Sequence, residues 1–381
     1  MSHAGLAEFV DQLQLIDHHV HGAFRADGDE PRFSNALSER NRDGCSTQAD
    51  GYESQLGFAI RRWCAEILDL PRNVDPQDYW ARRSSIGEAE VGRRFTRAAG
   101  ISDWLIDTGL TTDLADLADM AELSGGRTHE VVRLEKVAES LILELSSPTD
   151  YADAYVDRLA GLAGNAVAVK SVLAYRGGFN PDLSRPTNRE VSAAAARWRE
   201  QLEAGGKPPR LVDRSLITYG IYAALTIGLP LQFHVGFGDP DLNLRDVNPL
   251  HLTDFLRSPE AAQVPIMLLH CYPYEREAGY LAHAFDNVYF DIGLALNFVG
   301  ARSAALVARS LELAPFTKIM YSSDAYGPAE LHYLGARLWR NAIINVFEGW
   351  VAAGDWTESD ARRVVQLIGR DNAGRIYSLP G

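Results

Sequence analysis

Two histidines separated by a single residue lie near the start of the chain, in the segment 16–22 (IDHHVHG). The apolar residues before them predict a short buried strand, and alternate side chains of a strand share one face. His19 and His21 would then project together, and two adjacent imidazoles at a strand end can bind a metal ion. This HxH pair could equally form the polar end of a buried strand, so by itself it leaves both interpretations open.

Residue types that bind metals also follow four later apolar segments that predict strands. These residues are Lys170, His234, His270 and Asp324. The carboxyl ends of parallel strands meet on one side of a barrel, so a set in this order favours a metal site over unrelated core histidines. Nitrogen and carboxylate ligands suit zinc best, with manganese, iron and nickel as alternatives.

Three further polar residues near predicted strand ends could bind a substrate. Arg176 follows the Lys170 segment and could form a bidentate pair with a substrate carboxylate, although a surface salt bridge is an equally ordinary role. Asp107 and Glu135, at the ends of the second and third predicted strands, could bind a substrate ammonium group. The sequence thus proposes ligands for both charged ends of an amino-acid-like molecule.

A regular alternation of strands and helices is needed to position these residues. Short apolar segments predict strands at 16–22, 101–109, 130–135, 166–172, 229–236, 265–270, 287–293 and 318–325. Segments with helical periodicity separate them, and no antiparallel hairpin interrupts the series. Eight strands alternating with helices predict an α/β fold of the closed (β/α)8 TIM barrel type. We expect one barrel domain over 1–381, with extra C-terminal helices at 329–351 and 358–367.

A polar segment, 23–51, separates the first strand from the first long helical segment. It contains glycine, proline and scattered charges and shows no clean period. Long irregular connections in compact domains are usually functional or mobile, so this one is a candidate lid over the HxH pair. A disordered surface insertion is the alternative.

Composition limits the classes of partner. The chain has 381 residues and a formal net charge of -14, and without a basic patch it predicts no nucleic-acid partner. No segment approaches the about 18 continuous apolar residues of a membrane span, and no leader-like pattern precedes the first strand. Three cysteines without CxxC spacing fit a reducing compartment, so we expect a cytoplasmic protein that acts on a small molecule. Three aromatic residues on the late helical segments could form an interface in a homo-oligomer: Tyr333, Trp339 and Trp350.

Several of these motifs together resemble the amidohydrolase superfamily, and within it the amidohydrolase 2 branch. They are the HxH pair, the strand-end histidines, the Ser-Ser-Asp segment that ends at Asp324, and the closing sequence 370–377 (RDNAGRIY). The resemblance extends over 16–377. The segment 170–178 (KSVLAYRGG) further resembles the amidohydrolase-like domain that is fused to glutamine-synthetase-like domains in FluG and nodulin-type proteins.

The resemblance implies a metal site in one of two forms. In both, the HxH pair and Asp324 bind the more buried ion. A binuclear site would place a second ion on His234 and His270, with a carbamylated Lys170 as the bridge. In a mononuclear site, His234 would join the first ion, and His270 would act as an acid or polarise a carbonyl. Lys170 could also be an unmodified lysine that binds a carboxylate.

The implied reaction is hydrolysis of a C–N bond, most simply an amide. Asp324 would accept a proton from a metal-activated water and pass it to the departing amine, and His270 or the metal would stabilise the oxyanion. The substrate would be a γ-glutamyl amide or a similar amino-acid-derived amide. One alternative is a metal-dependent non-oxidative decarboxylase of an aromatic carboxylic acid, with Trp104, Tyr272 and Phe298 near the strand ends. A second is a metal-stabilised binding domain without catalysis, which would not need Asp324.

Overall fold

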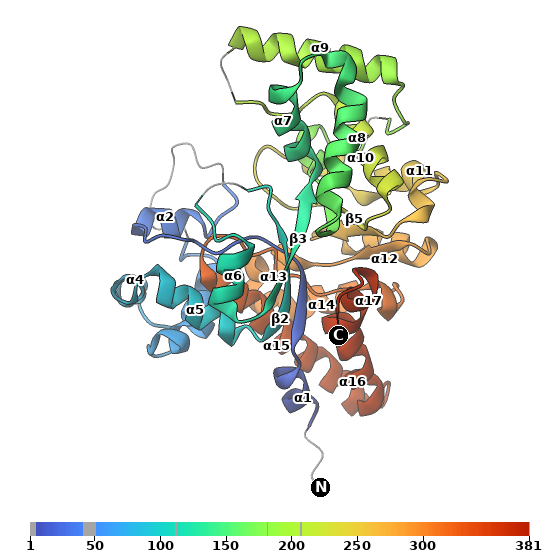
Figure 1. The fold of residues 1–381 in the computed structure, drawn as a ribbon. Helices are drawn as coiled ribbons and strands as arrows, with labels where there is room; N and C mark the ends of the chain where they lie inside the picture. The colour runs from blue at the N-terminus through green and yellow to red at the C-terminus, as the bar shows by residue number, and fades with distance from the viewer. Residues whose placement is uncertain (1–4, 41–50, 111–112, 181, 206–207, 381) are drawn as a thin grey trace.

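A parallel sheet forms the centre of the molecule (Figure 1). The computed structural model describes residues 5–40, 51–110, 113–180, 182–205 and 208–380. Its seven strands lie in sequence order, and each pairs in parallel with the next. They are β1 Leu15–Val20, β2 Ile101–Asp107, β3 Arg127–Arg133, β4 Ala166–Ser171, β5 Leu231–His234, β6 Ile266–Leu269 and β7 Val288–Phe290. Parallel neighbours need crossover connections, and helices supply them.

The predicted eighth strand, 318–325, is not a regular strand. Its residues nevertheless hydrogen-bond to both edges of the sheet: the Met320 amide donates to the Phe290 carbonyl (3.1 Å), and the Asp324 amide donates to the His19 carbonyl (3.1 Å). The prediction of a regular strand is wrong: the segment begins in a short 3-10 turn, Phe316–Lys318, and Ile319 forms only an isolated bridge with Phe290. At its other end Asp324 has a φ of 50°, which an extended chain does not adopt. The segment still joins the β7 edge to the β1 edge.

Helices surround the sheet, and α7 to α10 form a lobe at the top of Figure 1. The helices are α1 Leu6–Gln12, α2 Glu30–Asn35, α3 Gln55–Ala59, α4 Pro76–Ile86, α5 Glu88–Ala98, α6 Leu117–Ser124, α7 Leu134–Glu144, α8 Tyr151–Ala163, α9 Asn188–Gly205, α10 Arg214–Ile227, α11 Thr253–Leu256, α12 Glu275–Ala284, α13 Gly293–Val299, α14 Ser303–Ser310, α15 Ala329–Ala353, α16 Glu358–Gln366 and α17 Asn372–Ile376. Gly87, with a φ of 83°, separates α4 from α5. Among the described residues, no helix combines the length and apolar character that a membrane span requires.

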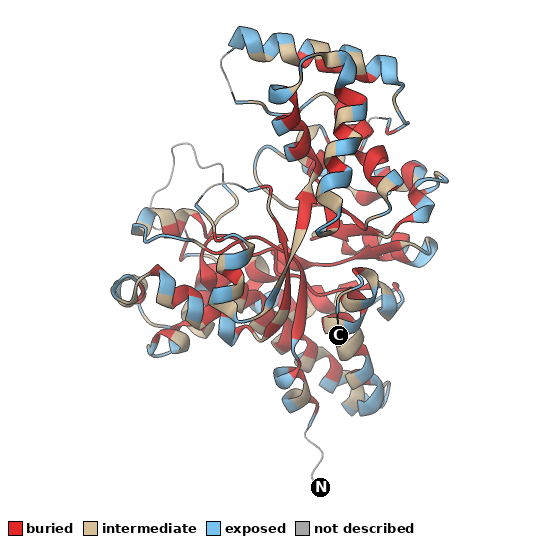
Figure 2. Cartoon of the chain, viewed as in Figure 1, coloured by how far each residue is buried: buried red, intermediate tan, exposed pale blue. Residues whose placement is uncertain are grey.

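Apolar side chains fill both faces of the sheet, and most strand residues are buried (Figure 2), although only Val131 and Val132 of β3 are. The larger cluster packs the strands against the surrounding helices. In the smaller one, strand residues such as Ile16, Leu105 and Val131 meet Ala373 of α17 and Tyr377. The C-terminal segment therefore packs against the second apolar cluster of the sheet.

The segment 23–51 is only partly irregular in its described part. Residues 23–40 contain the short helix α2, whose N-cap Asp29 accepts a hydrogen bond from the Arg32 amide. The positions 41–50, which also belong to the predicted lid, lie outside the described residues.

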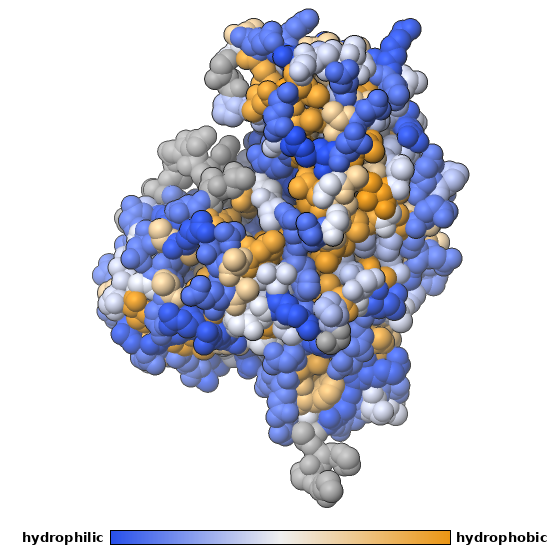
Figure 3. Space-filling view, viewed as in Figure 1, coloured by the Kyte–Doolittle hydropathy of each residue, from blue (hydrophilic) through white to orange (hydrophobic). Residues whose placement is uncertain are grey.

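The aromatic residues of the late helices do not form an exposed surface. Trp339 is 2% exposed, and Tyr333 and Trp350 pack against the core while remaining partly accessible. Exposed apolar side chains gather instead on the lobe of α7 to α10 (Figure 3), where Leu143 is 66% exposed. Tyr333, Trp339 and Trp350, which the sequence offered as a possible interface between copies of the chain, therefore pack mainly against the rest of the same chain.

A buried guanidinium holds the N-terminal helix against the sheet. Arg340 of α15 is 5% exposed and donates to the carbonyls of Val10, Leu13, Ala99 and Gly100. Those carbonyls lie at the end of α1, just before β1, and between α5 and β2. One side chain therefore joins three segments that are distant in sequence.

We expect Arg340→Leu to lower the free energy of unfolding by about 3 kcal/mol, because it leaves several buried carbonyls without a donor. Urea unfolding followed by circular dichroism measures this loss. Arg93→Leu is the control, since the Arg93 side chain is 46% exposed, and it should change stability by no more than about 0.5 kcal/mol. Equal stability of the two variants would contradict the role of Arg340.

Candidate metal centre

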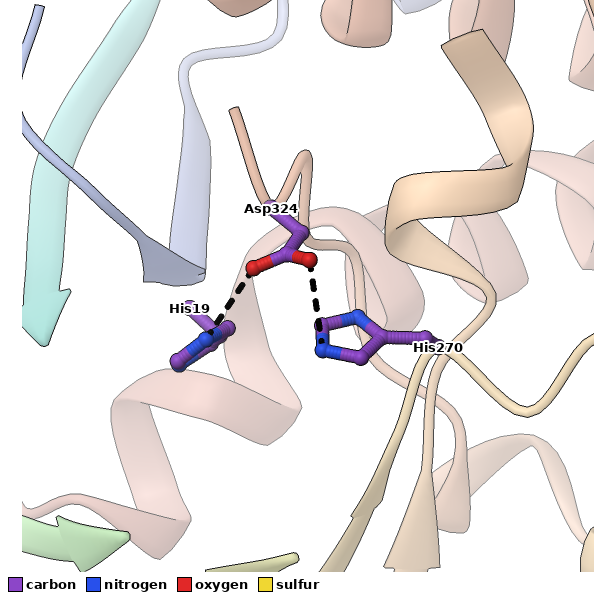
Figure 4. A group of neighbouring side chains, drawn as sticks. All are labelled: His19, His270 and Asp324. Atoms are coloured by element: carbon purple, nitrogen blue, oxygen red, sulfur yellow. Dashed lines mark ion pairs between the residues drawn. The ribbon is translucent and has the colours of Figure 1, made fainter. Parts of the chain in front are cut away.

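Asp324 lies between two histidines from different strands (Figure 4). One carboxylate oxygen is 3.2 Å from Nε2 of His19, and the other is 3.3 Å from Nε2 of His270. His270 follows β6 with a φ of 71°, and Asp324 has a φ of 50°. These left-handed residues turn the chain sharply at the ends of the strands, so three side chains from distant segments converge on one point.

The two histidines of the HxH pair each direct Nε2 toward Asp324. Nδ1 of His19 is 2.9 Å from the side-chain oxygen of Gln232, and Nδ1 of His21 is 3.0 Å from the carbonyl of Asp107. Both partners can only accept, so each Nδ1 carries the hydrogen and each Nε2 keeps a lone pair. Burial lowers the pKa of His21 to about 3 and that of His19 well below its usual value, so both rings are neutral at pH 7. Neutral, oriented imidazoles are what a metal ion requires.

Several polar atoms at this point have no hydrogen-bond partner. Both ring nitrogens of His270 and Oδ1 of Asp324 are buried without one, although charged neighbours lie close by. Buried polar groups are almost always paired, so such a cluster indicates a missing ligand. Candidate ligand atoms lie within 4.8 Å of one another in two groups, His19–His270–Asp324 and His19–His21–Asp107. Imidazole nitrogens and carboxylate oxygens at this separation fit a divalent metal ion.

Lys170 lies at the centre of the same cluster. Its amine is 2.7 Å from Nε2 of His19 and 3.3 Å from the carboxylate of Asp107. Burial lowers the pKa of Lys170, and the charge of Asp107 offsets part of that effect. The unmodified amine therefore donates to the lone pair that a metal ion on His19 would use. A metal there requires Lys170 to move or to lose its positive charge, as carbamylation would achieve.

Asp107 is surrounded by cations of the protein itself. Arg133, the last residue of β3, lies 2.6 Å from it, and Lys170 lies on its other side. Burial by itself would raise the pKa of Asp107, but the charges of Arg133 and Lys170 hold it well below its usual value. The carboxylate that we predicted to bind a substrate ammonium group is thus already paired twice.

Glu135 does not lie at the end of a strand, so its predicted position is wrong. The strand β3 ends at Arg133, and Glu135 is in the first turn of α7, where it is 2% exposed. Its carboxylate accepts hydrogen bonds from the Ser171 hydroxyl (2.7 Å) and the Val172 amide (3.0 Å). These bonds fix the end of β4 beside Lys170. The binding of a substrate by Glu135 stays a prediction.

His234 lies beside the cluster but outside both groups of candidate ligands found in the described chain. Its Nε2 is 3.0 Å from the Phe237 carbonyl and 3.1 Å from the Tyr175 hydroxyl, and its ring centre is 4.7 Å from that of His270. A carbonyl only accepts, so this Nε2 carries a hydrogen. Coordination through Nε2 would require that bond to break.

A pocket of about 330 Å³ leads to the cluster, which is the size of a small-molecule site. His21, Lys170, His234 and Asp324 line its inner part, and Ser38 to Arg40, from the end of the described part of 23–40, also line it. The predicted lid segment therefore contributes to the wall of the pocket.

Arg176 faces the same pocket. It donates to the carbonyls of Leu211 (2.8 Å) and Tyr175 (3.3 Å), and no carboxylate in the described part of the chain lies within ion-pair distance. Burial and the nearby charge of Arg210 lower the pKa of Arg176. The surface salt bridge that we considered for Arg176 is therefore absent among the described residues.

Sequence reasoning missed several residues that support the site. Gln232 precedes His234 by two positions on β5 and so shares its face, which was a usable signal. Asp291, next to β7, carried the weaker signal of an acid at a strand end. The His18 side chain lies outside both groups of candidate ligands in the described chain and contacts Tyr377 and Asp291 instead. The register of β1 against β2 is irregular between Asp17 and Val20.

Several known proteins are similar to this chain in sequence or fold. Protein fluG of Emericella nidulans is 31% identical over 308 residues, which are 72% of this chain and 35% of that protein. The chain thus spans about a third of the length of this curated relative. A candidate metal-dependent hydrolase of Lactobacillus casei ATCC 334 is 30% identical, with a TM-score of 0.85 over 98% of this chain and 97% of that one. The uronate isomerase of Thermotoga maritima, at 13% identity and a TM-score of 0.61 over 98% of this chain and 96% of that one, shares the fold.

A family model described as Amidohydrolase matches residues 143–379. This match extends from the end of α7 to just beyond α17. It includes four of the six predicted metal-site residues, namely Lys170, His234, His270 and Asp324, but not the HxH pair. The resemblance inferred from the sequence motifs is confirmed, and the chain belongs to the amidohydrolase family.

Proposed function

We propose that this protein is a metal-dependent hydrolase that cleaves an amide C–N bond of a small molecule. The observation that carries the proposal is the buried cluster of His19, His270 and Asp324, which contains unpaired polar atoms and adjoins the pocket that Asp324 lines. Membership of the amidohydrolase family supports the same chemistry.

The HxH pair and Asp324 would hold the metal ion, and zinc suits these ligands best. A bound divalent ion lowers the pKa of water to about 7 and so makes a nucleophile available at neutral pH. The chemical state of Lys170 would determine whether the site holds one metal ion or two. As a carbamate it would lose its positive charge and gain oxygen ligands, whereas as an amine it stays paired with Asp107.

Asp324 is suited to move the proton. Burial raises its pKa to about 6, and the charge of Lys170 limits the rise. At pH 7 most of this carboxyl group is ionised, yet it is a stronger base than an exposed aspartate. Asp324 would accept a proton from the attacking water and deliver it to the departing amine. His270, 3.3 Å from Asp324, would polarise the substrate carbonyl in the mononuclear form of the site.

The substrate would carry a carboxylate that binds Arg176. The Arg176 guanidinium lines the pocket and donates to backbone carbonyls, and no carboxylate of the described residues lies within ion-pair distance of it. An anion in the pocket would therefore supply its counter-charge. A γ-glutamyl amide or another amino-acid-derived amide has such a carboxylate at one end and a scissile amide at the other. The pocket of about 330 Å³ accommodates a molecule of this class.

A decarboxylase of an aromatic acid is the second candidate, because Arg176 could bind its carboxylate equally well. The aromatic residues near the strand ends support it less than the sequence suggested. Trp104 is 0% exposed and packs against His332, while the aromatic side chains that line the pocket are Tyr175 and Tyr326.

The metal-loaded protein should be assayed against γ-glutamyl amides, other carboxylate-bearing amides, neutral amides and aromatic carboxylic acids. Release of an amine from the carboxylate-bearing amides would support the hydrolase. Release of carbon dioxide from an aromatic acid would favour the decarboxylase. No turnover of any compound despite bound metal would favour the binding domain.

We expect chelator treatment to lower the melting temperature and added Zn²⁺ to restore it, because an ion that binds only the folded state stabilises it. The gain is about 2.7 kcal/mol at a free concentration 100 times the dissociation constant. Calorimetry measures the shift. His19→Ala should abolish the response, and His251→Ala, at an exposed position, should keep it. A full response in His19→Ala would contradict the assignment.

Asp324→Asn should reduce kcat by about 10² to 10⁴, since an amide cannot accept the proton. The metal content of the variant is measured alongside, so that loss of the ion is distinguished from loss of the base. The exposed Asp254→Asn, whose side chain is 96% accessible, is the control. A kcat within tenfold of the unmodified protein would exclude Asp324 as the base.

Arg176→Met should lower kcat/KM for carboxylate-bearing amides by about 10- to 100-fold, the effect of losing a charged hydrogen bond. Neutral amides should be unaffected. Steady-state kinetics on matched pairs of substrates, with and without the carboxylate, provides the measurement, and the exposed Arg245→Met serves as the control. Equal losses on both substrates of a pair would show that Arg176 does not bind the carboxylate.

A further inference from the structure

The closing sequence 370–377 is anchored at the end of the sheet where the strands begin. The Asn372 side chain donates to the carbonyls of Phe316 and Ile319, both at 2.8 Å. Arg370 donates to the Ser102 hydroxyl at the start of β2 (2.8 Å). Tyr377 is 3% exposed and belongs to the smaller apolar cluster. The segment therefore lies at the opposite end of the strands from the pocket, and it has no place in the proposed reaction.

The Tyr377 hydroxyl nevertheless connects to the metal-site histidines. It accepts a hydrogen bond from the Gln232 amide (2.9 Å) and lies 3.0 Å from Nδ1 of His18. The same amide group donates to the His18 carbonyl (3.0 Å), which places the Gln232 oxygen on the other side, 2.9 Å from Nδ1 of His19. Only one side chain, that of Gln232, separates Tyr377 from His19.

The hydrogen positions along this chain follow from the partners. The Asp291 carboxylate can only accept, so Nε2 of His18, 2.9 Å from it, carries a hydrogen. Nδ1 of a neutral His18 then accepts the hydrogen of the Tyr377 hydroxyl, whose oxygen accepts from the Gln232 amide. Each group along the chain has one role as donor or acceptor, and reversing one bond would leave a buried group unpaired.

A second branch reaches His270. The other oxygen of Asp291 accepts from the backbone amides of His270 (2.7 Å) and Gly293 (2.8 Å). The His270 backbone has a φ of 71°, a conformation that costs free energy for a residue other than glycine. The bond to Asp291 contributes to holding it there.

We propose that Tyr377 is a positioning residue for the metal centre, which sets the ring of His19 through Gln232 and the backbone of His270 through His18 and Asp291. This inference rests on the proposed metal site. It gives the closing sequence a function, because the C-terminal segment then fixes ligands that lie at the far ends of the strands. Partners of this kind typically change metal affinity by 10- to 100-fold.

The test is Tyr377→Phe, which removes only the hydroxyl. Competition with a chromophoric zinc chelator should show Zn²⁺ binding weakened by about 10- to 100-fold. Tyr155→Phe is the matched control, since Tyr155 is 1% exposed and its hydroxyl donates to the Leu134 carbonyl (3.0 Å), away from the site. The control should bind Zn²⁺ like the unmodified protein. Equal affinity in all three folded proteins would overturn the proposal.

A second measurement does not need the metal. Nitrogen-15 spectra of histidine-labelled, metal-free protein should show His19 with its hydrogen on Nδ1 and His18 with its hydrogen on Nε2. In Tyr377→Phe, Asp291 still holds the His18 hydrogen on Nε2, but Nδ1 of His18 loses its donor and its signal should shift downfield. The Gln232 amide loses an acceptor, so the Nδ1 signal of His19 should also move. Unchanged His18 and His19 signals would overturn the positioning role, whereas failure of the unmodified protein to bind Zn²⁺ would count against the metal site itself. If Tyr377→Phe does not fold, Gln232→Met removes the hydrogen bonds from Gln232 to Tyr377 and His19. This variant is then used in both the zinc competition and the nitrogen-15 measurement.

Discussion

Buried charges that must compensate one another constrain this structure more than any other interaction. Lys170, Asp107 and Asp324 are buried and the Arg133 side chain is only 11% exposed, and an unpaired ion in such a place would cost several kcal/mol. The two carboxylates together balance the two cations, and the surrounding imidazoles stay neutral because burial lowers their pKa values. The cluster is therefore nearly neutral as a whole, and a metal ion that enters it must change that balance.

The backbone conformation at the strand ends also serves to bring charged and polar side chains into this cluster. His270 and Asp324 adopt left-handed conformations, and each directs a polar side chain into the cluster instead of continuing a regular strand. Hydrogen bonds to Asp291 and to the His19 carbonyl stabilise the two turns. The irregular eighth segment is thus a consequence of placing a carboxylate between two histidines.

The two ends of the sheet have different roles, and hydrogen bonds through its interior link them. The pocket end presents Arg176, Lys170 and the histidines to a small molecule, while the other end is closed by the sequence 370–377. Between them, Gln232 links the Tyr377 hydroxyl to the ring of His19. An apolar cluster around this link keeps water out, so each of its hydrogen bonds is strong and specific.

The sequence alone determined the order of the seven strands and the helices, the HxH pair and the strand-end position of His270. These features follow from local periodicity, which depends on neighbouring residues only. Tertiary structure decided which polar groups are paired and how Asp324 reaches the histidines without a regular strand. It placed Glu135 in a helix and turned His18 toward Tyr377, because those outcomes depend on contacts between residues far apart in the sequence. Such contacts form only when the curled sheet brings its strands together, and no local pattern encodes them.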